Sequence, residues 1–298
     1  MPMAAWVDMK LAVISDIHGN YPALAAVMNH VDTWHPDGVI VAGDVVNRGP
    51  CSLTCLQRIE QRRRESGWQV IRGNHEDYVL EVLKDPSPRP GLEGAVRENV
   101  HWTCLQLGDV RAILEAMPPL VQLYGPDGSE VRITHASMRS NRENMFLDTP
   151  EELLRQQIAP APALFCMAHT HRPFVRQIDG TLLVNAGAVG MPFDGDVRAS
   201  YARLEWSPAA WYAEIVRVDY DRTRTEHDFY TSGYFEHSGP VAALIFREFQ
   251  SARPCLFTWM ERYRAPVLAG EISVEQAVRL HLASLTPAPG TSDQATAS

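Results

Sequence analysis

The chain has 298 residues and a mass of 33.3 kDa, with 45% hydrophobic and 21% charged residues. This composition is that of an ordinary globular protein and excludes collagen-like, coiled-coil and wholly disordered classes. Its 36 acidic residues outnumber its 27 basic ones, which gives a formal net charge of −9. Stable binding to nucleic acid is therefore not expected, because surfaces that bind phosphate backbones carry a basic surplus.

The cysteines and the apolar segments indicate a cellular compartment. The five cysteines form no C-x-x-C pair, so neither a disulfide framework nor a zinc ribbon is expected. No basic stretch followed by an apolar run opens the sequence, and no window is long and apolar enough to span a bilayer. We therefore expect a cytoplasmic protein without membrane partners.

The first part of the chain alternates strands and helices. Apolar runs at 10–15, 38–43 and 69–72 predict buried strands. Helices are predicted from about 20 to 34, over 51–65, from 77 to about 84, and around 94–104 and 107–116. This alternation predicts a parallel sheet with crossover helices.

The second part is richer in strands. They are predicted near 120–124, 130–135, 163–168, 173–178, 181–185, 199–206 and 211–218, with one helix at 151–157. Two packed sheets with helices outside satisfy this pattern. We predict a main domain over residues 1–220, a helical appendage over 221–284 with helices at 239–251, 254–263 and 273–284, and a disordered tail over 285–298.

Five short polar clusters each follow a predicted strand. They are Asp16-Ile-His18, Gly43-Asp44, Gly73-Asn74-His75-Glu76, Thr134-His135 and Ala168-His169-Thr170-His171. Loops at the carboxyl ends of strands form the ligand crevice of α/β sheets, so these clusters are expected to meet. Mixed imidazole and carboxylate ligands suit Mn, Fe, Zn or Co better than Ca or Mg. There are enough ligands for two ions.

Each cluster also has an ordinary explanation when it is taken alone. D-x-H matches occur by chance, Asp44 fits a helix N-cap, Gly73-Asn74 fits a turn, and His135 fits a hydrogen-bonded core histidine. Their joint occurrence, each at a strand end, favours metal binding instead.

In this order the clusters resemble the signature of the calcineurin-like metallophosphoesterases. The similarity runs from residue 10 to about 207 and is carried by Asp16-x-His18, Gly43-Asp44, Gly73-Asn74-His75, His135 and His169-x-His171. One departure is Ala168, where the family usually has Gly. The resemblance, which is to compact bacterial members, implies an α/β fold (α+β in some schemes): a four-layer αββα sandwich, with residues 1–220 as its catalytic domain.

The resemblance also implies a ligand for each position of a dinuclear centre. One metal is expected to be bound by Asp16, His18, Asp44 and His171, and the other by Asp44, Asn74, His135 and His169. Asp44 then bridges two divalent transition-metal ions, with Mn favoured. A hydroxide that bridges both ions is expected to attack phosphorus in line.

Two further residues are expected to act on the substrate. His75 is not a ligand in this scheme and is free to donate a proton to the leaving oxygen. Arg48 and Asn74 are expected to bind substrate, since a guanidinium fork matches two phosphoryl oxygens. The segment 43–50, together with Gly73-Asn74-His75-Glu76, resembles phosphoprotein phosphatases and symmetrical dinucleoside tetraphosphatases. Those enzymes usually carry Asp where this chain has Asn47. That Asp orients the proton donor, so the residue that orients His75 is left open.

These expectations favour a phosphomonoesterase that acts on a small phosphorylated substrate, a nucleotide or a phosphoprotein. Cleavage of a dinucleoside polyphosphate or of a phosphodiester is the first alternative. A repair-type nuclease is disfavoured by the net charge of −9 and by the lack of a large basic capping domain. A non-catalytic scaffold, such as the retromer subunit of this fold, is disfavoured because every ligand position is intact. The oligomeric state is left open.

Overall fold

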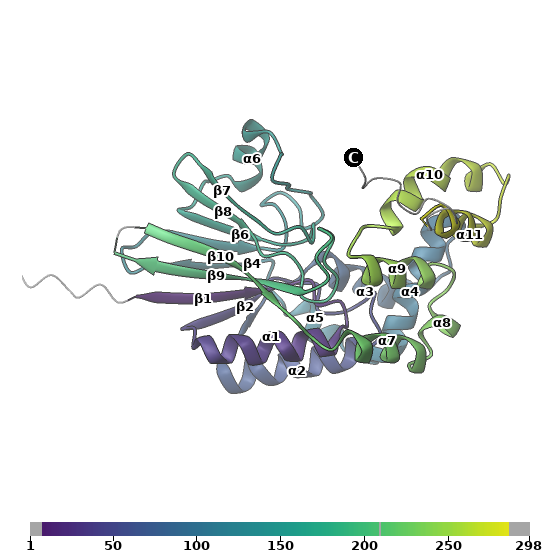
Figure 1. Ribbon diagram of the computed structural model, residues 1–298, viewed down its shortest axis with the longest axis horizontal. Helices are drawn as coiled ribbons and strands as arrows, with labels where there is room; N and C mark the ends of the chain where they lie inside the picture. Colours follow the sequence, from purple (N-terminus) through teal and green to yellow (C-terminus); the bar gives the residue numbers. More distant parts are fainter. Residues whose placement is uncertain (1–7, 209, 286–298) are drawn as a thin grey trace, which may run out of the picture.

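Two mixed five-stranded sheets pack face to face in the computed structural model, which describes residues 8–208 and 210–285 (Figure 1). The first has the order β10-β9-β1-β2-β3, with β1 Met9–Ile14, β2 Gly38–Val41, β3 Gln69–Val70, β9 Ala199–Ser207 and β10 Ala210–Val218. The second has the order β4-β5-β6-β8-β7, with β4 Leu120–Tyr124, β5 Glu130–Thr134, β6 Leu164–Met167, β7 Phe174–Ile178 and β8 Thr181–Asn185. The predicted strands are thus confirmed.

Parallel pairing places the ends that carry the polar clusters at one edge of the molecule. Strands β1, β2 and β3 are parallel in the first sheet, as are β5, β6 and β8 in the second. The antiparallel strands β9 and β10 extend the first sheet beyond β1. All of the predicted site segments therefore begin where a parallel strand ends.

Helices cover the outer faces and complete the predicted αββα order of layers. Those before residue 220 are α1 Tyr21–Trp34, α2 Ser52–Ser66, α3 Asn74–Lys84, α4 Gly91–Leu107, α5 Arg111–Glu115 and α6 Glu151–Ile158. Helix α1 starts at Asn20, whose side chain accepts a hydrogen bond from the N–H of Ala23, the usual N-cap arrangement. In Figure 1, α1 and α2 lie below the first sheet and α6 lies above the second.

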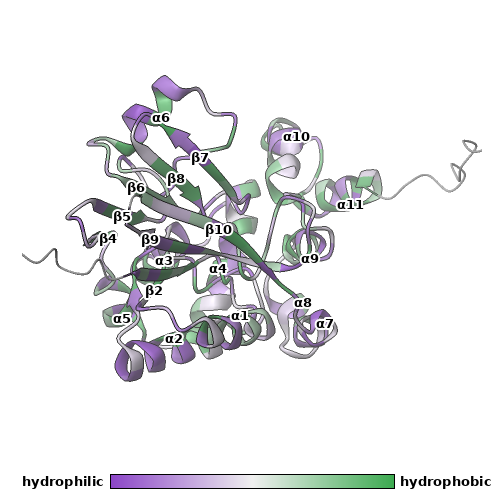
Figure 2. Ribbon diagram, turned by 60° about the vertical axis from the view of Figure 1, so that its left-hand side comes forward, coloured by the Kyte–Doolittle hydropathy of each residue, from purple (hydrophilic) through white to green (hydrophobic). Residues whose placement is uncertain are grey.

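The buried apolar side chains fill the spaces between these layers. Val13, Ile40, Ile133 and Val184 belong to the core between the two sheets. A second core joins α1 and α2 to the first sheet, and a third joins α6 to the second sheet. Figure 2 shows that both the strands and the outer helices carry hydrophobic and hydrophilic residues. Burial of this surface is the main favourable contribution to folding.

The C-terminal helices are α7 Arg222–Thr231, α8 Tyr234–His237, α9 Ala242–Ser251, α10 Leu256–Leu268 and α11 Val274–Leu285. Their side chains share one core with α4, in which Trp102 meets Tyr234 edge to face and Trp259 is fully buried. Met191, from the loop after β8, belongs to the same core. The appendage therefore packs beside the edge that carries the polar clusters, as Figure 1 shows for α9 and α4.

Two of these helices, α7 and α8, were not predicted. Helix α7 buries only Thr225 and Phe229, and α8 has four residues, so neither shows a helical repeat of apolar residues in its sequence. The predicted tail, 285–298, lies outside the described residues except for Leu285. In the part of the chain that the structure describes, no helix is long and apolar enough to cross a membrane.

Candidate metal centre

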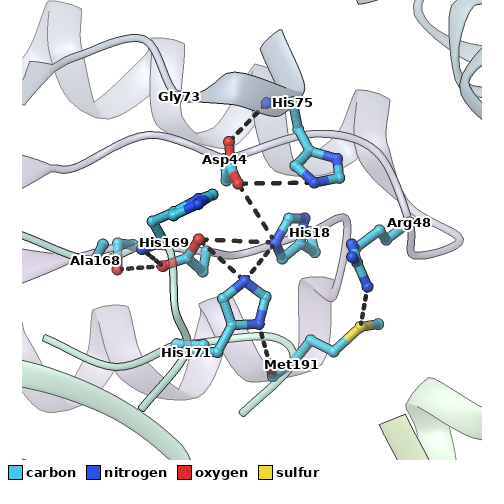
Figure 3. Close-up of polar contacts among 12 residues, drawn as sticks. His18, Asp44, Arg48, Gly73, His75, Ala168, His169, His171 and Met191 are labelled. Carbon is cyan, nitrogen blue, oxygen red and sulfur yellow. Dashed lines mark hydrogen bonds and ion pairs between the residues drawn. The ribbon is translucent and has the colours of Figure 1, made fainter. Parts of the chain in front are cut away.

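The loops at the carboxyl ends of β1, β2, β3, β5 and β6 bring all the predicted ligand side chains together. Figure 3 shows four of them close together, His18, Asp44, His169 and His171. Their backbone is unusual: among the described residues, seven of ten non-glycine positions with positive φ lie here, namely Asp16, His18, Asp44, Asn47, Arg48, His169 and His171. Such conformations are unfavourable and persist only where the surroundings fix them. The N–H of His18 donates to the carbonyl of Asp44 at 3.0 Å, one of the contacts that fix two loops together.

The first group of ligand atoms comes from Asp16, His18, Asp44 and His171, and these atoms lie within 4.8 Å of one another. Nε2 of His171 is 3.2 Å from Oδ1 of Asp16 and 3.1 Å from Nε2 of His18. Nδ1 of His171 donates to the carbonyl of Met191 at 2.5 Å. The lone pair of Nε2 therefore points into the group, which is the orientation that a metal ligand needs.

The second group comes from Asp44, His135 and His169, whose ligand atoms also lie within 4.8 Å of one another. Oδ1 of Asn74 lies between the two histidines, 2.8 Å from Nε2 of His135 and 2.9 Å from Nδ1 of His169. Nδ1 of His135 donates to the carbonyl of Ala42 at 2.8 Å, which turns Nε2 toward Asp44, 3.3 Å away. Asp44 thus belongs to both groups.

One buried oxygen tests whether this arrangement fits a cation. Oδ2 of Asp16 accepts from the Ser15 hydroxyl and from the N–H of His169. Oδ1 is buried and has no hydrogen-bond donor among the described residues. Leaving a buried carboxylate oxygen without a donor is costly. A cation beside Oδ1 removes that cost, and the mixture of carboxylate, amide and imidazole donors matches a divalent transition metal.

The protonation of the cluster also favours metal binding. Burial lowers the pKa of His169 to about 3 and also lowers that of His18, so both are neutral near pH 7. Burial acts the same way on His135, but the charge of Asp44 outweighs it and raises the pKa of His135 to about 10. A proton on His135 therefore faces Asp44 in the metal-free protein, and a cation that binds there must displace it.

His75 lies beside the cluster but belongs to neither group of ligand atoms. Its Nε2 is 4.0 Å from Oδ2 of Asp44, and its side chain is mostly buried. Nδ2 of Asn47 donates to Nδ1 of His75 at 2.8 Å, and the Thr103 hydroxyl donates to Oδ1 of Asn47 at 3.0 Å. Asn47 itself, held by Thr103 of α4, thus orients His75.

Arg48 lies on the side of the cluster where Figure 3 shows His18 and His75. Its positive charge contributes to lowering the pKa of both histidines, after burial as the largest cause. Nη1 contacts Sδ of Met191 at 3.7 Å and forms an ion pair with Glu248 of α9. This ion pair could not be predicted from the sequence.

Glu76 holds two of the site loops together. Its fully buried carboxylate accepts hydrogen bonds from the backbone N–H groups of Asp44 and Gly73 at 2.8 and 2.9 Å. It also accepts from Val45 at 2.8 Å and Val46 at 3.3 Å. One side chain thereby fixes the loop after β2 against the start of α3.

Sequence reasoning missed the roles of Glu76, Thr103 and Glu248. Glu76 had a signal, because a Glu three residues after a helix start is the capping-box position. Thr103 and Glu248 had none, because they meet Asn47 and Arg48 across 56 and 200 positions of the chain.

Comparison with known proteins shows what this chain is similar to. The profile of the calcineurin-like phosphoesterase superfamily domain matches residues 9–208. An uncharacterized protein of Methanocaldococcus jannaschii is 28% identical over 233 residues, which are 72% of this chain and 89% of that protein. A symmetrical bis(5'-nucleosyl)-tetraphosphatase of Neisseria gonorrhoeae is 40% identical over 70 residues. That match spans 23% of this chain and only 25% of the tetraphosphatase.

Two solved structures share the fold. A metallophosphoesterase from Sphaerobacter thermophilus superposes with a TM-score of 0.61 at 24% identity and covers 82% of this chain and 99% of its own. A hypothetical protein from Pyrococcus horikoshii superposes with a TM-score of 0.66 at 18% identity, over 78% of this chain and 97% of its own.

The role of Glu76 predicts a large loss of stability for Glu76→Ala. The substitution leaves four backbone donors without their acceptor, and a single unpaired buried donor already costs about 1–3 kcal/mol. We expect the free energy of unfolding to fall by at least about 3 kcal/mol, measured by urea denaturation. Glu81→Ala, on the same helix but with a side chain 54% exposed, is expected to change it by less than about 0.5 kcal/mol. Equal effects of the two variants contradict this role.

Proposed function

The chain belongs to the calcineurin-like phosphoesterase superfamily and is a metal-dependent phosphoester hydrolase; on that premise we propose that it hydrolyses phosphomonoesters at a dinuclear metal centre. The observation that carries the proposal is the pair of ligand groups that share Asp44. A shared carboxylate offsets the mutual repulsion of two cations.

The residues that would hold the metals follow from the two groups. Asp16, His18, Asp44 and His171 would hold one ion, and Asp44, His135 and His169 with Asn74 would hold the other. When bound, two divalent ions, for which Mn is our first choice, supply positive charge to phosphoryl oxygens and lower the pKa of a water that attacks phosphorus in line. The chain's own contribution is to aim the lone pairs and to keep the cluster buried.

His75 is proposed to give a proton to the leaving oxygen. Because Nδ1 accepts a hydrogen bond from Asn47, the proton of the neutral imidazole is on Nε2, the atom 4.0 Å from Asp44. Burial is the largest cause that lowers the pKa of His75, to about 3 in the free protein. A dianionic phosphoryl group raises the pKa of a neighbouring histidine. His75 would then take up a second proton at Nδ1, with the Asn47 amide turned so that its oxygen accepts, and would return to neutral imidazole by giving the Nε2 proton to the leaving oxygen.

Arg48 is proposed to bind the phosphoryl group and to favour monoesters. A terminal phosphoryl group is a dianion with free oxygens for a guanidinium, whereas a diester has one charge and one more oxygen in an ester bond. Hydrolysis of dinucleoside polyphosphates is the second candidate function. It is favoured by the 70-residue similarity to a symmetrical bis(5'-nucleosyl)-tetraphosphatase.

A substrate panel separates the two candidates. Mn-reconstituted protein is assayed with p-nitrophenyl phosphate, bis-p-nitrophenyl phosphate, a dinucleoside tetraphosphate and a phosphopeptide. The proposal expects the highest kcat/KM on a monoester. A higher kcat/KM on the dinucleoside tetraphosphate replaces it with the second candidate.

The shared carboxylate predicts the metal content of Asp44→Asn. Losing the charge common to both groups weakens both sites, so metal per chain is expected to fall from about two toward less than one. Elemental analysis after dialysis against Mn measures this, with Asp32→Asn, a partly exposed surface residue, as the control that keeps both ions. If the wild-type protein never takes up a second equivalent of Mn, the dinuclear proposal is wrong.

The position of His75 predicts a dependence on the leaving group. His75→Ala is expected to reduce kcat by about 10²–10⁴-fold on alkyl phosphates, the range for a lost general acid. The kcat on p-nitrophenyl phosphate is expected to fall less, since its leaving group needs little protonation. Metal content is expected to stay at the wild-type value, and exposed His227→Ala serves as the control. Equal losses on both substrates together with metal loss make His75 a ligand or a structural residue instead.

The guanidinium of Arg48 predicts a change in specificity. Arg48→Ala and Arg48→Lys are both expected to lose about 10²–10³-fold in kcat/KM on p-nitrophenyl phosphate, the loss typical of one deleted electrostatic donor. Lysine keeps the charge but not the planar two-point contact. The kcat/KM on bis-p-nitrophenyl phosphate is expected to fall less, so the ratio of diester to monoester kcat/KM, called the diester-to-monoester ratio below, rises. An unchanged ratio shows that Arg48 does not distinguish the terminal phosphoryl group.

A further inference from the structure

The proposed phosphate-binding arginine is held by a side chain of the C-terminal helices. Oε2 of Glu248, on α9, forms an ion pair with Nη1 of Arg48. The Glu248 side chain is 1% exposed and that of Arg48 is 15% exposed. Water therefore screens this pair far less than an ion pair on the surface. The contact joins the loop after β2 to the appendage, two parts that lie 200 positions apart in the chain.

The other oxygen of Glu248 is fixed as well. Oε1 accepts hydrogen bonds from the backbone N–H groups of Cys255 and Leu256, both at 2.8 Å, where α10 begins. Turning the carboxylate away from Arg48 breaks these bonds and leaves buried donors unpaired. Glu248 is therefore a permanent partner of Arg48 rather than a group that an incoming phosphate displaces.

The remaining contacts of Arg48 are weaker. Its guanidinium lies 5.7 Å from the centre of the Phe193 ring and 3.7 Å from Sδ of Met191. Its Nε is buried and has no hydrogen-bond partner among the described residues. Its own backbone has a φ of 68°, in the left-handed region. The ion pair with Glu248 is thus the strongest restraint on where the guanidinium sits.

We propose that Glu248 is a positioning residue, through which the C-terminal helices hold Arg48 beside His18 and His75 and thereby set the preference for a terminal phosphoryl group. This inference rests on the proposed role of Arg48. A preorganised guanidinium stabilises transition-state charge without having to rearrange when substrate binds. The appendage then contributes to catalysis through one carboxylate, although none of its described side chains belongs to either group of ligand atoms.

If Glu248 instead competes with phosphate for Arg48, its removal has the opposite effect. If Glu248 only neutralised Arg48 and competed with phosphate, then removing its charge would strengthen phosphate binding and raise monoesterase activity. The two backbone hydrogen bonds to Oε1 argue against this reading, because they prevent the carboxylate from yielding its place.

Glu248→Gln tests the proposal, since the amide keeps an oxygen for the two donors of α10 and removes the charge that holds Arg48. We expect kcat/KM on p-nitrophenyl phosphate to fall about tenfold or more, with a smaller fall on the bis ester, as expected for partial loss of one electrostatic donor. Binding of inorganic phosphate, measured by calorimetry on the Mn-loaded protein, is expected to weaken. In an Arg48→Ala background Glu248→Gln is expected to have no further effect, because coupled residues are not additive.

A control variant and a second substitution separate positioning from simple loss of structure. Ile245→Val changes a buried residue of the same helix and is expected to lower the melting temperature without altering the diester-to-monoester ratio. Glu248→Asp keeps the charge but moves it by one methylene, and is expected to raise the ratio as Glu248→Gln does. If Glu248→Gln does not fold, this variant decides, and an unchanged ratio overturns the proposal.

The remaining outcomes distinguish the inference from its premise. A rise in monoesterase activity or tighter phosphate binding in Glu248→Gln overturns the inference and makes Glu248 a competitor. A full loss that persists in the Arg48→Ala background also overturns it, because Glu248 then acts through the fold. If Arg48→Ala alone retains full activity, the proposed role of Arg48 fails and the inference falls with it.

Discussion

The buried carboxylate of Asp44 has to face imidazoles that come from both sheets, and the rest of the site is arranged around this constraint. Close approach explains why glycines flank it. A Cβ on Gly73 would lie 2.1 Å from Oδ1 of Asp44. A Cβ on Gly43, which also has a φ of +88°, would lie 2.8 Å from Nδ1 of His135. The Gly-Asp and Gly-Asn-His motifs are therefore consequences of packing two loops and an imidazole around one carboxylate. The carboxylate of Glu76 joins the two loops by hydrogen bonds to their backbone N–H groups.

The meeting of the candidate ligand residues at one edge was predictable from the sequence because it depends on local rules. Apolar runs of four to six residues mark the strands, and parallel strands bring their carboxyl ends to one edge. Asp16, Asp44 and His135 each follow a predicted apolar run, so their meeting at one edge could be predicted without knowledge of long-range contacts, whereas the assignment of each residue to one of two metal ions depended on the family resemblance. The sequence also predicted the helices α9 to α11, but not α7, which buries a single large apolar side chain, Phe229.

The contacts that adjust the site were not predictable in this way. Thr103 is one polar residue on α4, and nothing in its neighbourhood indicates that its hydroxyl binds Asn47. Glu248 lies in a helix dominated by buried Leu244, Ile245 and Phe249, where a single acidic residue suggests only a solvated position. Its burial becomes visible once the fold places α9 against the loop after β2. Residues that hold catalytic groups in place are recognised by three-dimensional contacts, whereas the catalytic groups themselves carry a motif.

The distribution of charge affects which size of anion the site favours. The chain as a whole carries −9, yet the candidate centre gathers imidazoles, Arg48 and donors aimed at cations. At physiological salt the potential of a surface charge is screened over about 8 Å. A small phosphate inside the centre therefore experiences mainly the nearby charge of Arg48, while a long polyanion also interacts with the net negative charge of the chain as a whole. The same screening acts least on the buried pair of Arg48 and Glu248, so this ion pair keeps its hold on the guanidinium at physiological salt. The proposed preference for a compact phosphoryl group thus depends on where the charges are buried, and not only on which residues supply them.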